Sequence, residues 1–137
     1  MLSSGLNSRR SLKWLAREAR LRISYKFMRD CLFCKIVKGE VKTDVVLETP
    51  MAMAFNDINP VSEVHVVIIT KKHIDSAVSV TDADAADVVA MHKAAAKLVV
   101  DRNLEAYRLA YNGGRFQHVG HIHMHLLAGP KVEWKRL

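Results

Sequence analysis

The C-terminal third of the chain contains a stretch, residues 121–125, that reads His-Ile-His-Met-His. Alternation with a period of two is typical of a β-strand, in which residues i, i+2 and i+4 share one face. The pattern therefore predicts a strand over residues 119–127 whose three imidazoles point to one side. Imidazole is well suited to act as a nucleophile, a base or a metal ligand near neutral pH. A cluster that only captures metal, or a fortuitous surface strand, is the simpler alternative.

The formal charge of +7 is concentrated in one part of the chain. Residues 1–30 hold eight basic residues against two acidic ones, a formal charge of +6, whereas residues 31–137 carry only +1. A nearly neutral body disfavours nucleic-acid binding by the domain, because such binding needs a basic surface. No apolar run approaches the roughly 20 residues of a membrane span, so no stable membrane association is expected.

Residues 1–30 are therefore expected to form an extension, and residues 31–137 one compact domain. In a helical projection of the extension, a basic stripe lies beside an apolar one. A basic, amphipathic, acid-poor N-terminus is typical of a mitochondrial transit peptide, and without that role the protein would be cytoplasmic. Two alternatives stay open. The first is that translation starts at Met28. The second is that the segment is a helix that packs on the domain or on a membrane surface.

Short apolar runs separated by turn residues predict strands in the rest of the chain, and one long helical pattern interrupts them. A short helix is expected over residues 32–37, and a long one over about 82–102 with Thr81 or Asp82 as its cap. Five short strands beside one long helix indicate an α+β fold with a mainly antiparallel sheet. The β-branched run at 64–70 is expected to be a central strand. The expected strands are residues 45–47, 51–55, 64–70, 107–111 and 119–127.

Several motifs, in order along residues 31–134, resemble the histidine triad (HIT) family of nucleotide-binding hydrolases and transferases. They are Cys-Leu-Phe-Cys-Lys-Ile at 31–36, Phe-Asn-Asp-Ile at 55–58, Val-His-Val-Val-Ile at 64–68, Asn-Gly-Gly at 112–114, Gln117, the triad and Trp134. The resemblance implies a HIT-like fold whose five-stranded sheet continues across a homodimer, through the long helix and the strand at 107–111. It also implies a purine nucleotide substrate, an AMP derivative.

By this resemblance His123 is the nucleophile, and the chemistry agrees, because a neutral imidazole attacks phosphorus without prior deprotonation. For this attack one ring nitrogen must be free, and the resemblance implies that a backbone carbonyl holds the other. Attack on the α-phosphorus would give a nucleotidyl-histidine that water then hydrolyses, with no metal required. His125 and Asn112 would hydrogen-bond the phosphate oxygens. His121 completes the catalytic set unless it serves a metal. His118, where close relatives often carry a small hydroxyl residue, is either a general acid or a solvated loop residue.

The resemblance also implies a set of substrate-binding residues. Asp57 would accept both ribose hydroxyls, although a turn-forming aspartate beside Pro60 is a common alternative. Trp134 would cross to the active site of the partner subunit and shape its leaving-group pocket. The other residues implied are Phe33, Ile36 and Ile58, which would surround the base or belong to the core, and Gln117.

Cys31 and Cys34 are the only cysteines, and Cys-x-x-Cys supplies half of a tetrahedral zinc site. Similar relatives bind zinc through two further histidines, which the resemblance assigns to His65 and His121. His121 would then be structural rather than catalytic. The alternative is a free, reduced cysteine pair with His65 hydrogen-bonded inside the fold. His73 follows two lysines and is expected at the surface.

Three functions are compatible with the sequence. The first is a hydrolase of nucleoside 5′-phosphoramidates of the AMP-amide type. The second is a dinucleoside polyphosphate hydrolase, a branch that tends to have a longer C-terminal region and a glutamine where Val119 stands. The third is a zinc-stabilised nucleotide-binding or scaffold protein with little catalysis, against which the complete triad argues.

Overall fold

The computed structural model describes residues 12–13, 15–17, 19–20 and 30–132. The chain divides into two compact units, residues 1–30 and residues 31–137. The described residues of the first unit are helical, as the amphipathic pattern predicts. Among all the described residues, no helix is both long enough and apolar enough to cross a membrane. The targeting role of residues 1–30 stays a prediction.

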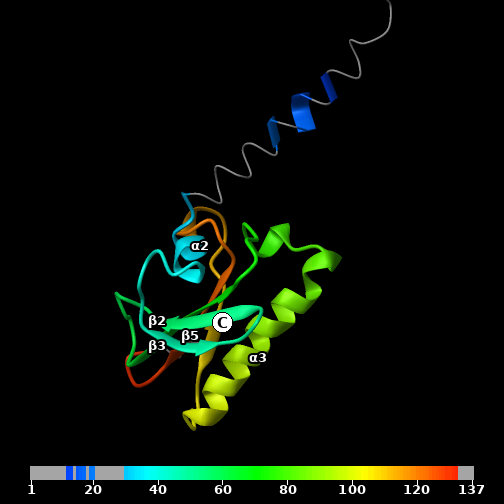
Figure 1. Cartoon of the computed structure of the whole chain (residues 1–137). Helices are drawn as coiled ribbons and strands as arrows, with labels where there is room; N and C mark the ends of the chain where they lie inside the picture. Colours follow the sequence, from blue (N-terminus) through cyan, green and yellow to red (C-terminus); the bar gives the residue numbers. More distant parts are fainter. Residues whose placement is uncertain (1–11, 14, 18, 21–29, 133–137) are drawn as a thin grey trace, which may run out of the picture. The chain divides into compact units, whose positions relative to one another are not determined.

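The second unit is built on one antiparallel sheet (Figure 1). Its strand order is β1-β2-β3-β5-β4, and every neighbouring pair is antiparallel. The β-branched run of β3 lies at the centre, as expected, while β1 and β4 are the edges. The predicted α+β fold with five strands is confirmed. The strands are β1 (Val45–Glu48), β2 (Ala52–Asn56), β3 (Val64–Thr70), β4 (Arg108–Ala110) and β5 (His123–Ala128).

The two faces of the sheet differ because successive side chains of a strand point to opposite sides. One face packs against the long helix α3 (Ala85–Asp101), which crosses it in Figure 1. The other face carries a second apolar cluster beneath the short helix α2 (Leu32–Val37). The apolar residues of the triad motif belong to the first core, as the alternation predicts, and are Ile122, Met124 and Leu126.

The starts of both helices, and the end of α2, follow from their sequences. Cys31 caps α2, because its Sγ accepts a hydrogen bond from the backbone N–H of Cys34. Gly39, at φ 77°, follows the end of α2 in the left-handed conformation that glycine adopts without strain. Thr81 and Asp84 form a capping box, and the 3₁₀ turn that it opens leads into α3. The expected cap at Thr81 is confirmed, and the α-helix proper begins one turn later.

The triad motif is not one continuous strand, and the predicted strand over residues 119–127 is too long at its start. β5 begins at His123. Before it, the backbone N–H of His121 bonds the carbonyl of Val119, and that of Ile122 bonds the carbonyl of Ile74. This turn ties the motif to the loop after β3. His121 therefore meets different neighbours from the two histidines of β5.

Candidate active site and metal centre

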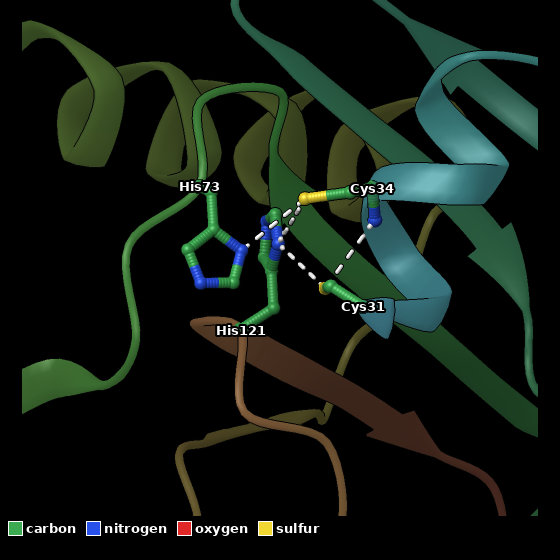
Figure 2. A group of neighbouring side chains, drawn as sticks. All are labelled: Cys31, Cys34, His73 and His121. Atoms are coloured by element: carbon green, nitrogen blue, oxygen red, sulfur yellow. Dashed lines mark hydrogen bonds between the residues drawn. The ribbon is translucent and has the colours of Figure 1, made fainter. Parts of the chain in front are cut away.

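Two cysteines and two histidines converge from α2, the loop after β3 and the turn before β5 (Figure 2). The ligand atoms of Cys31, Cys34, His73 and His121 lie within 4.8 Å of one another. Nδ1 of His121 is 3.5 Å from Cys31 Sγ and 3.6 Å from Cys34 Sγ. Nδ1 of His73 is 3.2 Å from Cys34 Sγ, and both thiols are free. Two sulfur and two nitrogen ligands are a usual set for a structural metal site.

The hydrogen bonds of these two histidines engage Nε2 and leave Nδ1, the nitrogen that faces the cysteines, available to a metal. Nε2 of His121 is 2.7 Å from the backbone carbonyl of Thr70, and Nε2 of His73 is 2.9 Å from Asp75 Oδ1. Because a carbonyl and a carboxylate only accept, each Nε2 carries the proton and each Nδ1 lone pair faces the cysteines. Ligating histidines commonly donate their other N–H in this way. The residues present therefore fit a divalent metal ion.

Burial controls the charge of this cluster. It raises the pKa of Cys34 to about 12, with hydrogen bonding to Cys31 as the next cause. It also lowers the pKa of His121 to about 4. Desolvation thus favours neutral groups here, and a bound divalent ion would supply the positive charge that stabilises thiolates.

His65 is not part of this cluster, so its predicted role as a metal ligand is wrong. His65 lies near the start of β3, and His121 bonds Thr70 at its end. Five residues of strand separate these positions by about 16 Å. His73, expected at the surface, is the fourth member of the cluster, because the loop after β3 brings its Nδ1 to 3.2 Å from Cys34 Sγ.

His123 and His125 lie side by side on the face of β5 opposite α3, with ring centroids 5.1 Å apart. Nδ1 of His123 is 2.7 Å from the backbone carbonyl of His121. Since a carbonyl only accepts, the proton of His123 lies on Nδ1 and the lone pair on Nε2. An imidazole held in this form can attack an electrophile. The hydrogen bond is of the kind that the family resemblance implies.

A cavity of about 980 Å³ opens on this face of the sheet. Its volume lies at the upper end of the range for small-molecule sites, about 300–1,000 Å³. His123 is 6% exposed and adjoins the cavity without lining it, packed edge-on against the Phe33 ring at 5.1 Å between centroids. The predicted site residues that line the cavity are Phe33, Ile36, Asp57, Ile58, Asn112, His118 and His125.

One described residue that was predicted to bind substrate, Gln117, does not line this cavity. Its amide instead donates to the backbone carbonyls of Asp75, at 2.7 Å, and Val119, at 3.0 Å. These bonds link the segment that precedes the triad to the loop after β3. Gln117 therefore has a structural role in place of the predicted contact with substrate. Trp134 lies outside the described residues.

His65 lines the cavity, which the sequence reasoning missed. Its Nε2 is 2.9 Å from His125 Nδ1 and 3.3 Å from Asp57 Oδ2. The three ligand atoms lie within 4.8 Å of one another. However, 2.9 Å is a hydrogen-bond distance, shorter than the roughly 3.3 Å between two nitrogens on one tetrahedral zinc. Burial is the main cause that lowers the pKa of His65 and that of His125, the latter to about 4.

Comparison with known proteins agrees with this arrangement. Residues 30–135 match the family model described as "Scavenger mRNA decapping enzyme C-term binding". The chain is 35% identical over 106 residues to adenosine 5′-monophosphoramidase hnt1 of Schizosaccharomyces pombe, which covers 76% of this chain and 77% of that protein. A HIT family hydrolase of Legionella pneumophila is 40% identical with a TM-score of 0.73, covering 77% of this chain and 97% of its own. A HIT family hydrolase of Clostridium thermocellum is 38% identical with a TM-score of 0.72, covering 79% and 96%. The family model, the relatives and the triad geometry together show that the chain belongs to the histidine triad family.

Proposed function

We propose that this protein hydrolyses nucleoside 5′-phosphoramidates, compounds of the AMP-amide type, through a covalent nucleotidyl-histidine at His123. The observation that carries the proposal is the hydrogen bond from Nδ1 of His123 to the carbonyl of His121, because it leaves a nucleophilic nitrogen next to the cavity. The relatives support the class of reaction. Two are HIT family hydrolases, and the S. pombe protein is an adenosine 5′-monophosphoramidase.

The reaction takes place in two steps. Nε2 of His123 attacks the α-phosphorus, a phosphorus–histidine bond forms, and the bond to the leaving amine breaks as that amine takes up a proton. Water then attacks the same phosphorus, AMP leaves, and the imidazole is restored. His125 and Asn112, which line the cavity, donate hydrogen bonds to the phosphate oxygens in both steps.

We assign protonation of the leaving amine to His118. This histidine is exposed and lines the cavity, and its charge is one of the causes that lower the pKa of His125. Histidine is the side chain that most often transfers protons in catalysis near neutral pH. His118→Ala should therefore slow alkyl amides, whose basic amines leave poorly, more than anilides. His118→Ser carries the hydroxyl typical of close relatives and is the matched control. Equal slowing of both substrate classes would refute the assignment.

The nucleoside is recognised by the rest of the cavity lining. Oδ1 of Asp57 accepts the backbone N–H of Asn59 at 2.8 Å, which fixes the carboxylate beside the cavity, where it would accept the ribose hydroxyls. Phe33 and Ile36 provide a buried apolar surface for the purine. Ile58, 89% exposed, stands at the cavity rim and can cover the base.

The proposed function is tested by the ratio of kcat/KM values for AMP-amides and for dinucleoside polyphosphates. AMP-amides should rank first. A higher rank for the dinucleoside polyphosphates would favour the competing hydrolase, and AMP binding without turnover of either class would favour a binding protein. His123→Asn should abolish turnover and leave the Kd for AMP within a few-fold of wild type, because only bond making is removed.

We also propose that the cysteine–histidine cluster binds zinc as a structural ion. Its four ligands leave no open coordination position, which is the arrangement of structural rather than catalytic zinc. The ion would fix the start of α2 and His121 together. Since the carbonyl of His121 holds His123, this support extends to the nucleophile.

We propose further that the protein is a homodimer formed through α3 and β4. A groove of about 740 Å³ lies between these elements. β4 is an edge strand, and a two-fold related copy would pair with its open side. Light scattering should give twice the 15.4 kDa chain mass, and Leu109→Glu should give a monomer. A monomeric wild type would contradict the proposal. The apolar residues exposed along the groove are Val89, Val100, Tyr107 and Leu109.

The mitochondrial role of residues 1–30 is proposed from their charge of +6 and from the helical conformation of their described part. A fluorescent protein fused to this segment should accumulate in mitochondria. A scrambled segment of the same composition is the control. Diffuse fluorescence with the native segment, or a mature protein that begins at Met28, would favour the alternative start site.

A further inference from the structure

The loop between β4 and β5 carries an exposed aromatic ring that has no part in the reaction as described so far. Phe116 is 64% exposed and is the last residue of the 3₁₀ turn Gly114–Phe116. Two backbone hydrogen bonds hold this turn, from the N–H of Phe116 to the carbonyl of Gly113 and from the N–H of Gln117 to the carbonyl of Gly114. A ring that an ordered turn presents to water gains free energy when an apolar ligand covers it.

The backbone directs this ring to the side on which His118 lies. Gln117, between the two residues, is extended, with φ −86° and ψ 106°. In an extended segment, residues two apart point to the same side, and their Cα atoms lie about 7 Å apart. Gln117 points the other way, where its amide donates to the carbonyls of Asp75 and Val119. Since His118 lines the cavity, the Phe116 ring stands beside His118, just outside the cavity rim.

Arg115 adds a positive charge to the same surface. Its guanidinium carbon lies over the Phe116 ring, 5.1 Å from the centroid, which is a cation–π contact. The ring keeps its 64% exposure with Arg115 on one face, so the rest is open to a second ring. Arg115 is exposed and forms no ion pair with any residue in the described part of the chain. Its N–H groups are therefore available to an anion, and guanidinium binds carboxylates with two parallel hydrogen bonds.

The leaving group of the proposed reaction lies on this side of the cavity. Protonation of the leaving amine is assigned to His118, so the amine nitrogen must come within hydrogen-bond distance of that imidazole. The nucleoside is assigned to the part of the cavity that α2 and the end of β2 form, around Phe33 and Asp57. Substituents on the amine therefore extend away from the nucleoside, past His118 and toward Phe116 and Arg115.

We infer that Phe116 and Arg115 form a subsite for the leaving group, and that this subsite selects amines that carry both an aromatic ring and a carboxylate. The favoured substrates are AMP-amides of aromatic amino acids, linked through the α-amino group. The side-chain ring of the amino acid packs against Phe116, and its carboxylate pairs with Arg115. The inference rests on the proposed function, because it needs the phosphorus–nitrogen bond to lie beside His118. It accounts for two neighbouring exposed side chains that neither the nucleoside site nor the metal centre uses.

Three AMP-amides, of phenylalanine, alanine and phenethylamine, separate the two features. Phe116→Ala should lower the ratio of kcat/KM for the phenylalanine and alanine amides about 3- to 10-fold, because the stacked ring is lost. Arg115→Gln should lower the ratio for the phenylalanine and phenethylamine amides about 2- to 5-fold, and less at high salt. Differences in amine basicity cancel, since each ratio is compared with the same ratio in wild type. An unchanged ratio in either variant at low salt would overturn the inference.

Two further variants serve as controls. Phe116→Tyr keeps an aromatic ring and should keep the wild-type preference for the phenylalanine amide. Val78→Ala truncates an apolar side chain that is 95% exposed, in the loop after β3, and should change neither ratio. A preference that Phe116→Tyr loses as fully as Phe116→Ala would refute the stacking role of the ring.

Binding measured without turnover separates this inference from the proposed function. In His123→Asn, calorimetry should give a lower Kd for the phenylalanine amide than for the alanine amide, and adding Phe116→Ala should remove the difference. Nuclear Overhauser effects should connect the ligand ring to the ring of Phe116, and their absence at saturation would overturn the inference. If these results hold but wild type cleaves no amide, the function is refuted and the subsite stands. Cleavage of all three amides without regard to ring or carboxylate would do the reverse.

Discussion

Replacing His73 tests which histidine completes the metal centre. His73→Ala removes one of the four converging ligands, whereas His65→Ala removes none. Structural zinc sites of four ligands bind with roughly 10–16 kcal/mol in total, so one ligand contributes about 2.5–4 kcal/mol. His73→Ala should therefore weaken zinc binding by about 10²- to 10³-fold. A milder variant is Asp75→Asn, which keeps the ligand but weakens the acceptor that orients it at 2.9 Å. Asp75→Asn should weaken zinc binding about 10- to 100-fold.

The assay is metal content by mass spectrometry after purification without chelator, followed by competition with a chromophoric chelator to obtain the Kd. Wild type and His65→Ala should hold close to one zinc per chain, and His73→Ala should lose its zinc at chelator concentrations that leave the others loaded. Its melting temperature should fall as well, because the metal stabilises the folded state. Full zinc affinity in His73→Ala together with loss in His65→Ala would refute the assignment.

Other predictions concern pH and packing. Burial lowers the pKa of His125 from 6.5 to about 4, so the unfolded chain binds a proton between these values that the folded chain does not. The contribution of His125 to the free energy of unfolding should therefore be complete above pH 6.5 and should be lost as the pH falls toward 4. This contribution is about 3 kcal/mol before it is discounted for solvent screening, and His125→Gln should reduce the pH dependence measured in urea titrations by that share. Leu126, which is 0% exposed, and its cross-strand partner Leu109, which is 38% exposed, face the same side of the sheet. In urea denaturation Leu126→Ala should cost about 2–5 kcal/mol and leave the mass of the assembly unchanged, whereas Leu109→Ala should mainly weaken the proposed dimer.

Local patterns predicted most of the fold because each rests on short-range physics. Alternation placed Met124 and Leu126 on the face opposite the histidines, which is the face that packs against α3, and the β-branched run of β3 marked the central strand. Thr81, one of the two caps expected, marked the start of the long helix region, where the structure shows it in a capping box with Asp84. The start of β5 was misjudged, because period-two alternation continues back to His121 although the backbone turns away there.

The residues of the cysteine–histidine cluster could not all be predicted, because their meeting depends on which end of a strand lies beside which loop. The alternation of side chains along β3 and β5 correctly places His65 on the same face of the sheet as His123 and His125. In an antiparallel pair, however, the start of β3 lies beside the end of β5, and its end lies beside His123. Strand direction alone could therefore have excluded His65 and pointed to His73. The tautomer of His121 could not be predicted from the sequence, since it depends on a hydrogen bond to the backbone carbonyl of Thr70, which is 51 residues away in the chain.

Trapping the intermediate tests the central claim most directly. Full-length protein is mixed with an AMP-amide, quenched at alkaline pH during turnover, and analysed by intact mass and peptide mapping. The alkaline quench is required because phosphorus–histidine bonds are labile in acid. We expect one nucleoside monophosphoryl group per chain at most, attached to His123, absent in His123→Asn, and lost when the substrate is exhausted. An adduct on another residue, or steady turnover by His123→Asn, would contradict the account.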